Sequence, residues 1–156
     1  MGDAFETVEV DARRFVGLRA TFGWADTSGI PAHWDAFGEQ IESWPAHRPV
    51  WGLSLRPEAG DPAEGFDYMP AVESDATPTG RMTHVALPAG TWAKFRHEGP
   101  LSGMPASCRA AFGAVEASPE WHHAGGPLQI AEEYGADFDP GTGKGGVDLW
   151  VPVTRA

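Results

Sequence analysis

Ser28-Gly29-Ile30-Pro31-Ala32 opens a segment that the chain repeats 74 residues later (102 minus 28) as Ser102-Gly103-Met104-Pro105-Ala106. The two copies also agree at Ala36 and Ala110, at Glu42 and Glu116, and at Pro45 and Pro119. Each copy carries apolar residues at helical steps and a proline in its first turn, which predicts a helix that ends before Pro45 or Pro119. The apolar stripes are Ile30, Trp34, Phe37, Ile41 and Trp44 in the first copy, and Met104, Cys108, Ala111, Phe112 and Val115 in the second.

Stretches rich in β-branched and aromatic residues flank both predicted helices and predict strands. They are Phe5–Val10, Phe15–Phe22, Val50–Leu55, Phe66–Glu73, Met82–Leu87, Thr91–His97, Leu128–Tyr134 and Val147–Val153. The pattern is a duplicated β-α-β-β unit, with repeat 1 at about 5–75 and repeat 2 at about 80–154 of one domain spanning 1–156. We expect an α+β fold in which the tandem units are related by a pseudo-twofold axis. An antiparallel sheet would form a platform, with two helices and a central cleft between the halves.

Composition narrows the classes of function. A chain of 156 residues with 42% hydrophobic content fits a single domain with its own core. A net charge of −11 repels phosphate backbones and anionic lipids, so we expect no direct binding to nucleic acid and none to membranes. No export signal, lipidation signal or long apolar segment is visible, which predicts a cytoplasmic protein.

Candidate metal and cofactor motifs fail on inspection. The single cysteine, Cys108, excludes a disulfide framework and a multi-cysteine zinc site. The run 143–146 lacks the residues of a phosphate loop, and the acidic residues from 137 to 148 lack the glycine and glutamate of a calcium loop. We therefore expect no cofactor and no metal.

Tryptophan is abundant, with seven copies in the chain. Trp24, Trp51, Trp92 and Trp150 lie on or beside predicted strands. Core packing explains each of them singly, whereas as a set they could form flat walls for an aromatic or cationic ligand. Trp34 lies on the helical stripe, where we expect a core role.

The run Leu87-Pro88-Ala89-Gly90-Thr91-Trp92-Ala93-Lys94-Phe95-Arg96-His97-Glu98-Gly99-Pro100 resembles the central signature of GyrI-like small-molecule-binding domains, also called AraC effector-binding domains. Three further segments support the resemblance: Phe66-Asp67-Tyr68, Glu132-Glu133-Tyr134 leading into 137–140, and Leu149-Trp150-Val151-Pro152-Val153. With the helices, these segments cover nearly the whole chain in the family's order. The repeats leave no residues for a DNA-binding helix-turn-helix, so the chain resembles a stand-alone member.

The resemblance implies a central cleft that takes hydrophobic, often aromatic or cationic, compounds around one acidic side chain. The glutamate of the family's Glu-x-Tyr strand falls on Glu132, with Tyr134 on the same strand face. Glu133 is the alternative, and only one of the two glutamates can enter the cleft because neighbouring strand residues point to opposite faces. A carboxylate among aromatic rings loses hydration, which raises its pKa. The expected ligand-binding set is Glu132, Tyr134, Tyr68, Trp51, Trp92, Trp150 and Trp24.

Three functions remain open at this point. The first is a domain that binds drug-like aromatic or cationic small molecules. The second is a hydrolase of cyclopropanoid genotoxins, in which Glu132 acts as general base and Tyr134 or His97 donates a hydrogen bond to the carbonyl. The third is a protein partner role, because members of the family that the sequence resembles modulate DNA gyrase.

Overall fold

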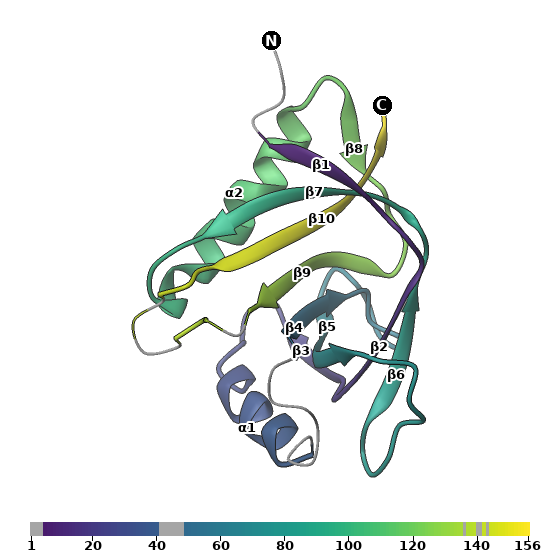
Figure 1. Cartoon of the computed structure of the whole chain (residues 1–156), viewed down its shortest axis with the longest axis vertical. Coiled ribbons are helices and arrows are strands. Elements are labelled where there is room, and N and C mark those ends of the chain that lie inside the picture. The colour runs from purple at the N-terminus through teal and green to yellow at the C-terminus, as the bar shows by residue number, and fades with distance from the viewer. Residues whose placement is uncertain (1–4, 41–48, 136, 140–141, 143) are drawn as a thin grey trace.

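The computed structural model describes residues 5–40, 49–135, 137–139, 142 and 144–156. The helices are α1 (Ile30–Gln40), the short 3-10 helix η1 (Leu101–Gly103) and α2 (Met104–Ala117). The strands are β1 (Glu6–Val10), β2 (Arg13–Gly17), β3 (Ala20–Gly23), β4 (Val50–Leu55), β5 (Gly65–Glu73), β6 (Thr83–Leu87), β7 (Gly90–His97), β8 (Trp121–His123), β9 (Leu128–Tyr134) and β10 (Val147–Arg155). Figure 1 shows their arrangement along the chain.

All described strand pairings are antiparallel, in the order β1-β7-β10-β9-β4-β5-β2-β6, with β3 beside β5 and β8 beside β10. The order is symmetric about the central pair: β4-β5-β2 on one side corresponds to β9-β10-β7 on the other. Each half receives its outermost strand from the other half, because β1 pairs with β7 and β6 pairs with β2. The expected α+β fold, an antiparallel sheet with two helices, is confirmed.

The predicted strand from Phe15 to Phe22 is divided in two. β2 pairs with the end of β5 and β3 with its beginning, and the residues between them lie opposite Met69 and Pro70. Pro70 has no N–H for the ladder, although its carbonyl accepts a hydrogen bond from the Leu18 N–H at 3.0 Å. Arg19 turns its side chain onto Asp67 at the same place, with 2.6 Å between Nε and Oδ2. Sequence reasoning also missed β8, a short strand on β10.

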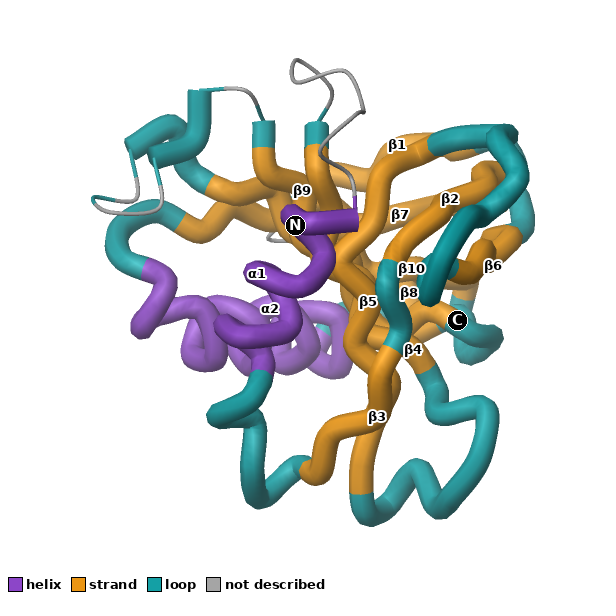
Figure 2. The backbone as a smooth tube through the Cα atoms, turned by 90° about the horizontal axis from the view of Figure 1, so that it is seen from below, coloured by secondary structure: helices purple, strands orange, loops and turns teal. Residues whose placement is uncertain are grey.

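Both helices lie where the repeated segment predicted them, on the same side of the strands (Figure 2). Met104, Ala111 and Val115 of α2 pack in one cluster with β10, and Trp34 of α1 borders that cluster. Phe37 of α1 is buried in a second cluster with β2 and β5. The predicted stripe positions Ile41 and Trp44 lie outside the described residues.

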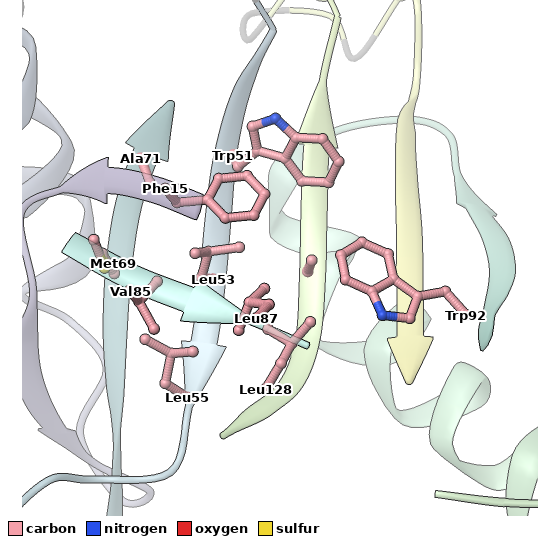
Figure 3. Close-up of a cluster of buried hydrophobic side chains, with 11 residues drawn as sticks. Phe15, Trp51, Leu53, Leu55, Met69, Ala71, Val85, Leu87, Trp92 and Leu128 are labelled. Atoms are coloured by element: carbon pink, nitrogen blue, oxygen red, sulfur yellow. The ribbon is translucent and has the colours of Figure 1, made fainter. Parts of the chain in front are cut away.

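The opposite face of the sheet holds a separate apolar core (Figure 3). Trp51 and Trp92 are each 3% exposed and lie in this core with aliphatic residues of β4, β5, β6 and β9. The Arg13 guanidinium lies 4.7 Å from the Trp51 ring and 5.1 Å from the Trp92 ring, at the border of the core. The two faces therefore differ: helices cover one of them, and on the other the core is enclosed by side chains of the strands themselves.

Among the described residues, no helix is long and apolar enough to cross a membrane.

Candidate functional site

A buried carboxylate lies on the helix-covered face, at the centre of the sheet. Glu132 is on β9, next to the central β4–β9 pairing, and is only 7% exposed. Its Oε1 accepts two hydrogen bonds, one from the Tyr68 hydroxyl at 2.9 Å and one from the Tyr134 hydroxyl at 2.5 Å. Tyr134 is two residues along the same strand, whereas Tyr68 comes from β5 of the other half. The site thus joins both halves of the chain.

Gly52 makes this geometry sterically feasible. It lies directly opposite Glu132 on β4, and a Cβ atom there would be 2.2 Å from the Tyr68 Oη and 2.9 Å from the Glu132 Oε1. No side chain fits at such distances. The absence of a side chain at position 52 is what lets Tyr68 reach across β4 to the carboxylate.

Trp34 of α1 extends the hydrogen-bonded chain toward the surface. Its Nε1–H donates to the Tyr68 hydroxyl at 3.2 Å, so the order is Trp34 to Tyr68 to Glu132. The Trp34 ring also meets the Tyr134 ring edge to face, with centroids 5.4 Å apart at 80°. Phe138 lies on the other side of Tyr134 at 5.0 Å. Aromatic rings therefore surround the carboxylate.

The second carboxylate oxygen is free to accept a partner. Both tyrosines bind Oε1, and no hydrogen bond to Oε2 is formed within the described part of the chain. No fully buried side-chain oxygen or nitrogen among those residues lacks a hydrogen bond, so Oε2 keeps some contact with solvent. One oxygen of Glu132 is fixed by the protein and the other is available to a ligand.

Burial controls the protonation of all three groups. It raises the pKa of the Glu132 carboxyl above 4.5, against the two tyrosine hydrogen bonds, which favour the charged form. Burial and the neighbouring carboxylate together raise the pKa values of Tyr68 and Tyr134 above 10. Both phenols therefore stay protonated and continue to donate to Oε1 at neutral pH.

Cys108 of α2 packs against the same hydrophobic cluster as Tyr134. Burial, and after it the charge of Glu132, raise the pKa of the Cys108 thiol to about 12. A thiol with such a pKa is almost entirely protonated at neutral pH and is a poor nucleophile. We read Cys108 as an apolar wall residue, in agreement with its place on the predicted helical stripe.

The structure separates the two neighbouring glutamates. Glu132 faces the helices, whereas Glu133 lies on the opposite face and accepts a hydrogen bond from the Trp150 indole at 3.0 Å. Trp51 and Trp92 are on that same face. The predicted grouping of Trp51, Trp92 and Trp150 with Glu132 is therefore corrected, because neighbouring strand residues point to opposite faces and Trp51 pairs with Glu133 rather than with Glu132.

Two other predicted residues also lie away from Glu132. His97 is buried beside the start of α2, where Nδ1 is 2.6 Å from the Ser107 hydroxyl and Nε2 is 3.0 Å from the Pro100 carbonyl. A carbonyl only accepts, so Nε2 carries the hydrogen and both ring nitrogens are used within the fold. Trp24 is 51% exposed at the end of β3 and lines a different groove. Trp24 therefore does not lie beside Glu132 as expected, and the catalytic role expected of His97 stays a prediction.

The two described grooves do not include Glu132. One, of about 120 Å³, lies between the β6–β7 turn and the β8–β9 connection. The other, of about 310 Å³, lies between Trp24 and Phe112. Side chains of Trp34, Tyr68 and Tyr134 instead pack around the carboxylate. No group of three or more His, Cys, Asp or Glu residues that could hold a metal ion occurs within the described ranges.

The fold is an α+β domain in which an antiparallel sheet carries two helices. The model of the GyrI-like small molecule binding domain matches residues 4–154, and the chain belongs to this family. No curated protein matches the chain.

Solved structures of low sequence identity share the fold. SAV2435 bound to tetraphenylphosphonium has a TM-score of 0.75 at 16% identity, covering 96% of this chain and 93% of that one. The EcmrR C-terminal domain has a TM-score of 0.70 at 15% identity, covering 100% of both chains. A hydrolase from Listeria innocua has a TM-score of 0.55 at 12% identity, covering 96% and 91%.

Sequence reasoning missed two residues of the site. The place of Trp34 on the helical stripe predicts a core role, whereas the structure places it half-buried with its indole N–H on the Tyr68 hydroxyl. Gly52 stands within a predicted strand. An isolated glycine inside a strand pattern indicates that another group approaches the backbone closely, and this signal could have identified Gly52.

Proposed function

We propose that this domain binds hydrophobic aromatic cations at Glu132, between α1 and α2. The observation that carries the proposal is a carboxylate that is 7% exposed, has one oxygen fixed by two tyrosines and has the other free. No arginine or lysine forms an ion pair with Glu132 within the described part of the chain. A buried, unpaired carboxylate is costly, and a cationic ligand supplies the missing charge.

The surroundings favour a bulky organic cation over a small hydrated one. A compact ammonium or metal ion loses strong hydration on entering an apolar site, whereas a charge spread over aromatic groups loses little. Trp34, Tyr134 and Phe138 offer ring faces and edges to such groups. Tetraphenylphosphonium, present in the structure of SAV2435, belongs to this chemical class.

Entry of a ligand of this size requires Trp34 to move. Trp34 is half-buried and is attached to the site by one long hydrogen bond of 3.2 Å and by edge-to-face ring contacts. These interactions are individually weak, on the order of 1 kcal/mol each. In this proposal the Trp34 side chain covers Glu132 in the free protein and repacks against the bound cation.

Calorimetric titration of Glu132→Gln and Glu133→Gln with tetraphenylphosphonium tests the proposal. Both variants remove one negative charge from neighbouring positions, but only Glu132 faces the helices. We expect Glu132→Gln to weaken tetraphenylphosphonium by about tenfold to a hundredfold, with Glu133→Gln close to the wild type. Neutral triphenylphosphine oxide should bind both variants equally. Equal losses in the two variants would reduce the effect to overall charge and reject the site.

A hydrolytic reaction at the same carboxylate is the second candidate. The raised pKa of Glu132 makes it a stronger base, and its free Oε2 could accept a proton from water. Against this, both tyrosine hydroxyls already donate to Oε1, so neither proton is free for a substrate carbonyl. Mass spectrometry after incubation with a cyclopropanoid compound separates the candidates: a gain of one water that Glu132→Gln abolishes establishes hydrolysis, and an unchanged mass favours binding alone.

A further inference from the structure

A second groove lies away from Glu132, and exposed aromatic side chains form its walls. It has a volume of about 310 Å³ and is lined by Trp24, Arg56, Phe112, His123, Gln129 and two glycines of the β8–β9 connection. Large apolar side chains that are exposed are few among the described residues: Trp24 at 51%, Leu101 at 39% and Phe112 at 37%. Two of these three meet in this groove. Apolar surface gathered in one concave place indicates a binding site.

The Trp24 ring is held in a fixed orientation although it is exposed. It stacks on Phe66 with centroids 4.5 Å apart at 25°, and its Nε1–H donates to the Pro62 carbonyl at 2.9 Å. A ring with one face packed and its polar atom satisfied presents its other surface without further loss of conformational entropy. Trp24 is therefore a preorganised flat wall.

His123 contributes shape and no charge. Its Nε2–H donates to the Gln129 carbonyl at 2.9 Å, and its Nδ1 accepts from the Gly125 N–H at 3.0 Å. Because one nitrogen donates and the other accepts, the ring is in its neutral form. Its centroid is 6.2 Å from that of Phe112, so the two rings form a continuous apolar side of the groove.

Arg56 gives the groove its charge. Its backbone is fixed on both sides, since its N–H donates to the Pro127 carbonyl at 2.9 Å and its carbonyl accepts from Arg19 at 2.9 Å. Its side chain forms no hydrogen bond or ion pair within the described ranges. No carboxylate of the residues described in the structure lines the groove, although the whole chain carries a net charge of −11. An unpaired guanidinium between aromatic walls complements a flat anion.

We propose that the groove between Trp24 and Phe112 binds planar aromatic anions, such as aryl sulfonates and aryl carboxylates. The aromatic part lies between the two rings, and Arg56 binds the anionic group. This site is separate from Glu132, which lies three residues further along β9 than Gln129, about 10 Å away. The domain thus carries two sites of opposite charge preference on one strand.

Calorimetric titration with naphthalene-2-sulfonate and neutral 2-naphthalenemethanol tests the proposal. In the wild type, the sulfonate should bind more tightly than the alcohol. Arg56→Gln should weaken the sulfonate about tenfold and leave the alcohol unchanged, and Phe112→Ala should weaken both ligands about fivefold. The matched control is Arg81→Gln, which removes an exposed arginine that does not line the groove and should change neither affinity.

Glu132→Gln serves as a second control and should leave the sulfonate affinity unchanged, which separates this test from that of the cation site. Several results would overturn the proposal: no sulfonate binding, no preference for the sulfonate over the alcohol, or equal losses in Arg56→Gln and Arg81→Gln. Light scattering could give a further result that overturns the proposal. A wild-type dimer that Phe112→Ala dissociates would mean that a second copy of the chain occupies the groove.

Discussion

Replacing Gly52 by alanine should disrupt the Tyr68–Glu132 contact from the neighbouring strand. The added Cβ would lie 2.2 Å from the Tyr68 Oη, 3.0 Å from its Cζ and 2.9 Å from the Glu132 Oε1. An ordinary contact begins near 3.4 Å, so the hydroxyl has to move by about 1.2 Å (3.4 minus 2.2). A shift of this size breaks or strongly bends the 2.9 Å hydrogen bond to the carboxylate.

Two costs follow from this displacement. Losing a buried hydrogen bond to a charged group costs about 1.5–3 kcal/mol. Overpacking a buried site costs about 1–3 kcal/mol more. Because the same displacement produces both, the costs overlap, and we expect Gly52→Ala to lower the free energy of unfolding by about 2–4 kcal/mol.

Urea unfolding, followed by tryptophan fluorescence, measures this loss. Gly38→Ala is the matched control, because Gly38 lies within α1 and an added Cβ there meets no atom within 4 Å. Alanine is the better helix former, so Gly38→Ala should raise the free energy of unfolding by about 0.5–1 kcal/mol. The same substitution thus has opposite signs at the two positions.

The double variant Gly52→Ala/Tyr68→Phe shows whether the stated contact is the cause. Tyr68→Phe removes the atom nearest to the new methyl group, leaving contacts of 2.9 Å with the Glu132 Oε1 and 3.0 Å with ring carbon Cζ. Gly52→Ala should therefore cost about 1–2 kcal/mol less in the Tyr68→Phe background than in the wild type. Equal costs in both backgrounds would refute the reasoning, because the hydroxyl would then play no part in the loss.

Further expectations concern the protonation of the site. Burial raises the pKa of Glu132 above 4.5, so the stability that the protonated carboxyl contributes is fully present below pH 4.5. This stability is lost as the pH rises through the folded-state pKa. Urea unfolding of Glu132→Gln at a series of pH values should lack that loss. Cation affinity should rise through the same window, and Tyr134→Phe should move the rise to higher pH because the Tyr134 hydrogen bond lowers the Glu132 pKa. Because its pKa is about 12 against an ordinary 9.0, the Cys108 thiol should react with iodoacetamide about a thousandfold more slowly than a free thiol at pH 8. Glu132→Gln should accelerate the reaction, because the Glu132 charge contributes to the raised pKa. A rate equal to that of free cysteine would contradict the burial of the thiol.

The arrangement of strands and helices was predictable because local patterns specify it. The repeated segments beginning at Ser28 and Ser102 predicted both helices, and the apolar runs predicted the strands of β4 and β9 at their observed bounds. The division at Leu18 was not predictable, because it depends on Pro70, a residue of another strand that cannot continue the ladder. β8 is too short to give a pattern of its own.

The site was predictable only in part, for a similar reason. The family resemblance predicted Glu132, Tyr134 and Tyr68. Strand alternation predicted that Glu132 and Glu133 would point to opposite faces of the sheet. Alternation within one strand does not tell which face of the sheet a side chain on another strand occupies. The predicted set therefore includes Trp51 with Glu132, although Trp51 lies on the other side of the sheet. That grouping depends on strand register, which arises from pairing across the whole chain.

The most direct test of the account locates a bound cation. Tetraphenylarsonium is an isostere of tetraphenylphosphonium, and its arsenic gives an anomalous signal in a crystal of the complex. The account predicts one arsenic peak on the helix-covered face between α1 and α2, beside the Glu132 carboxylate, with the Trp34 ring displaced from the Tyr68 hydroxyl. A peak beside Trp51 and Trp92 on the opposite face, with Glu132 still bound only to its tyrosines, would contradict it.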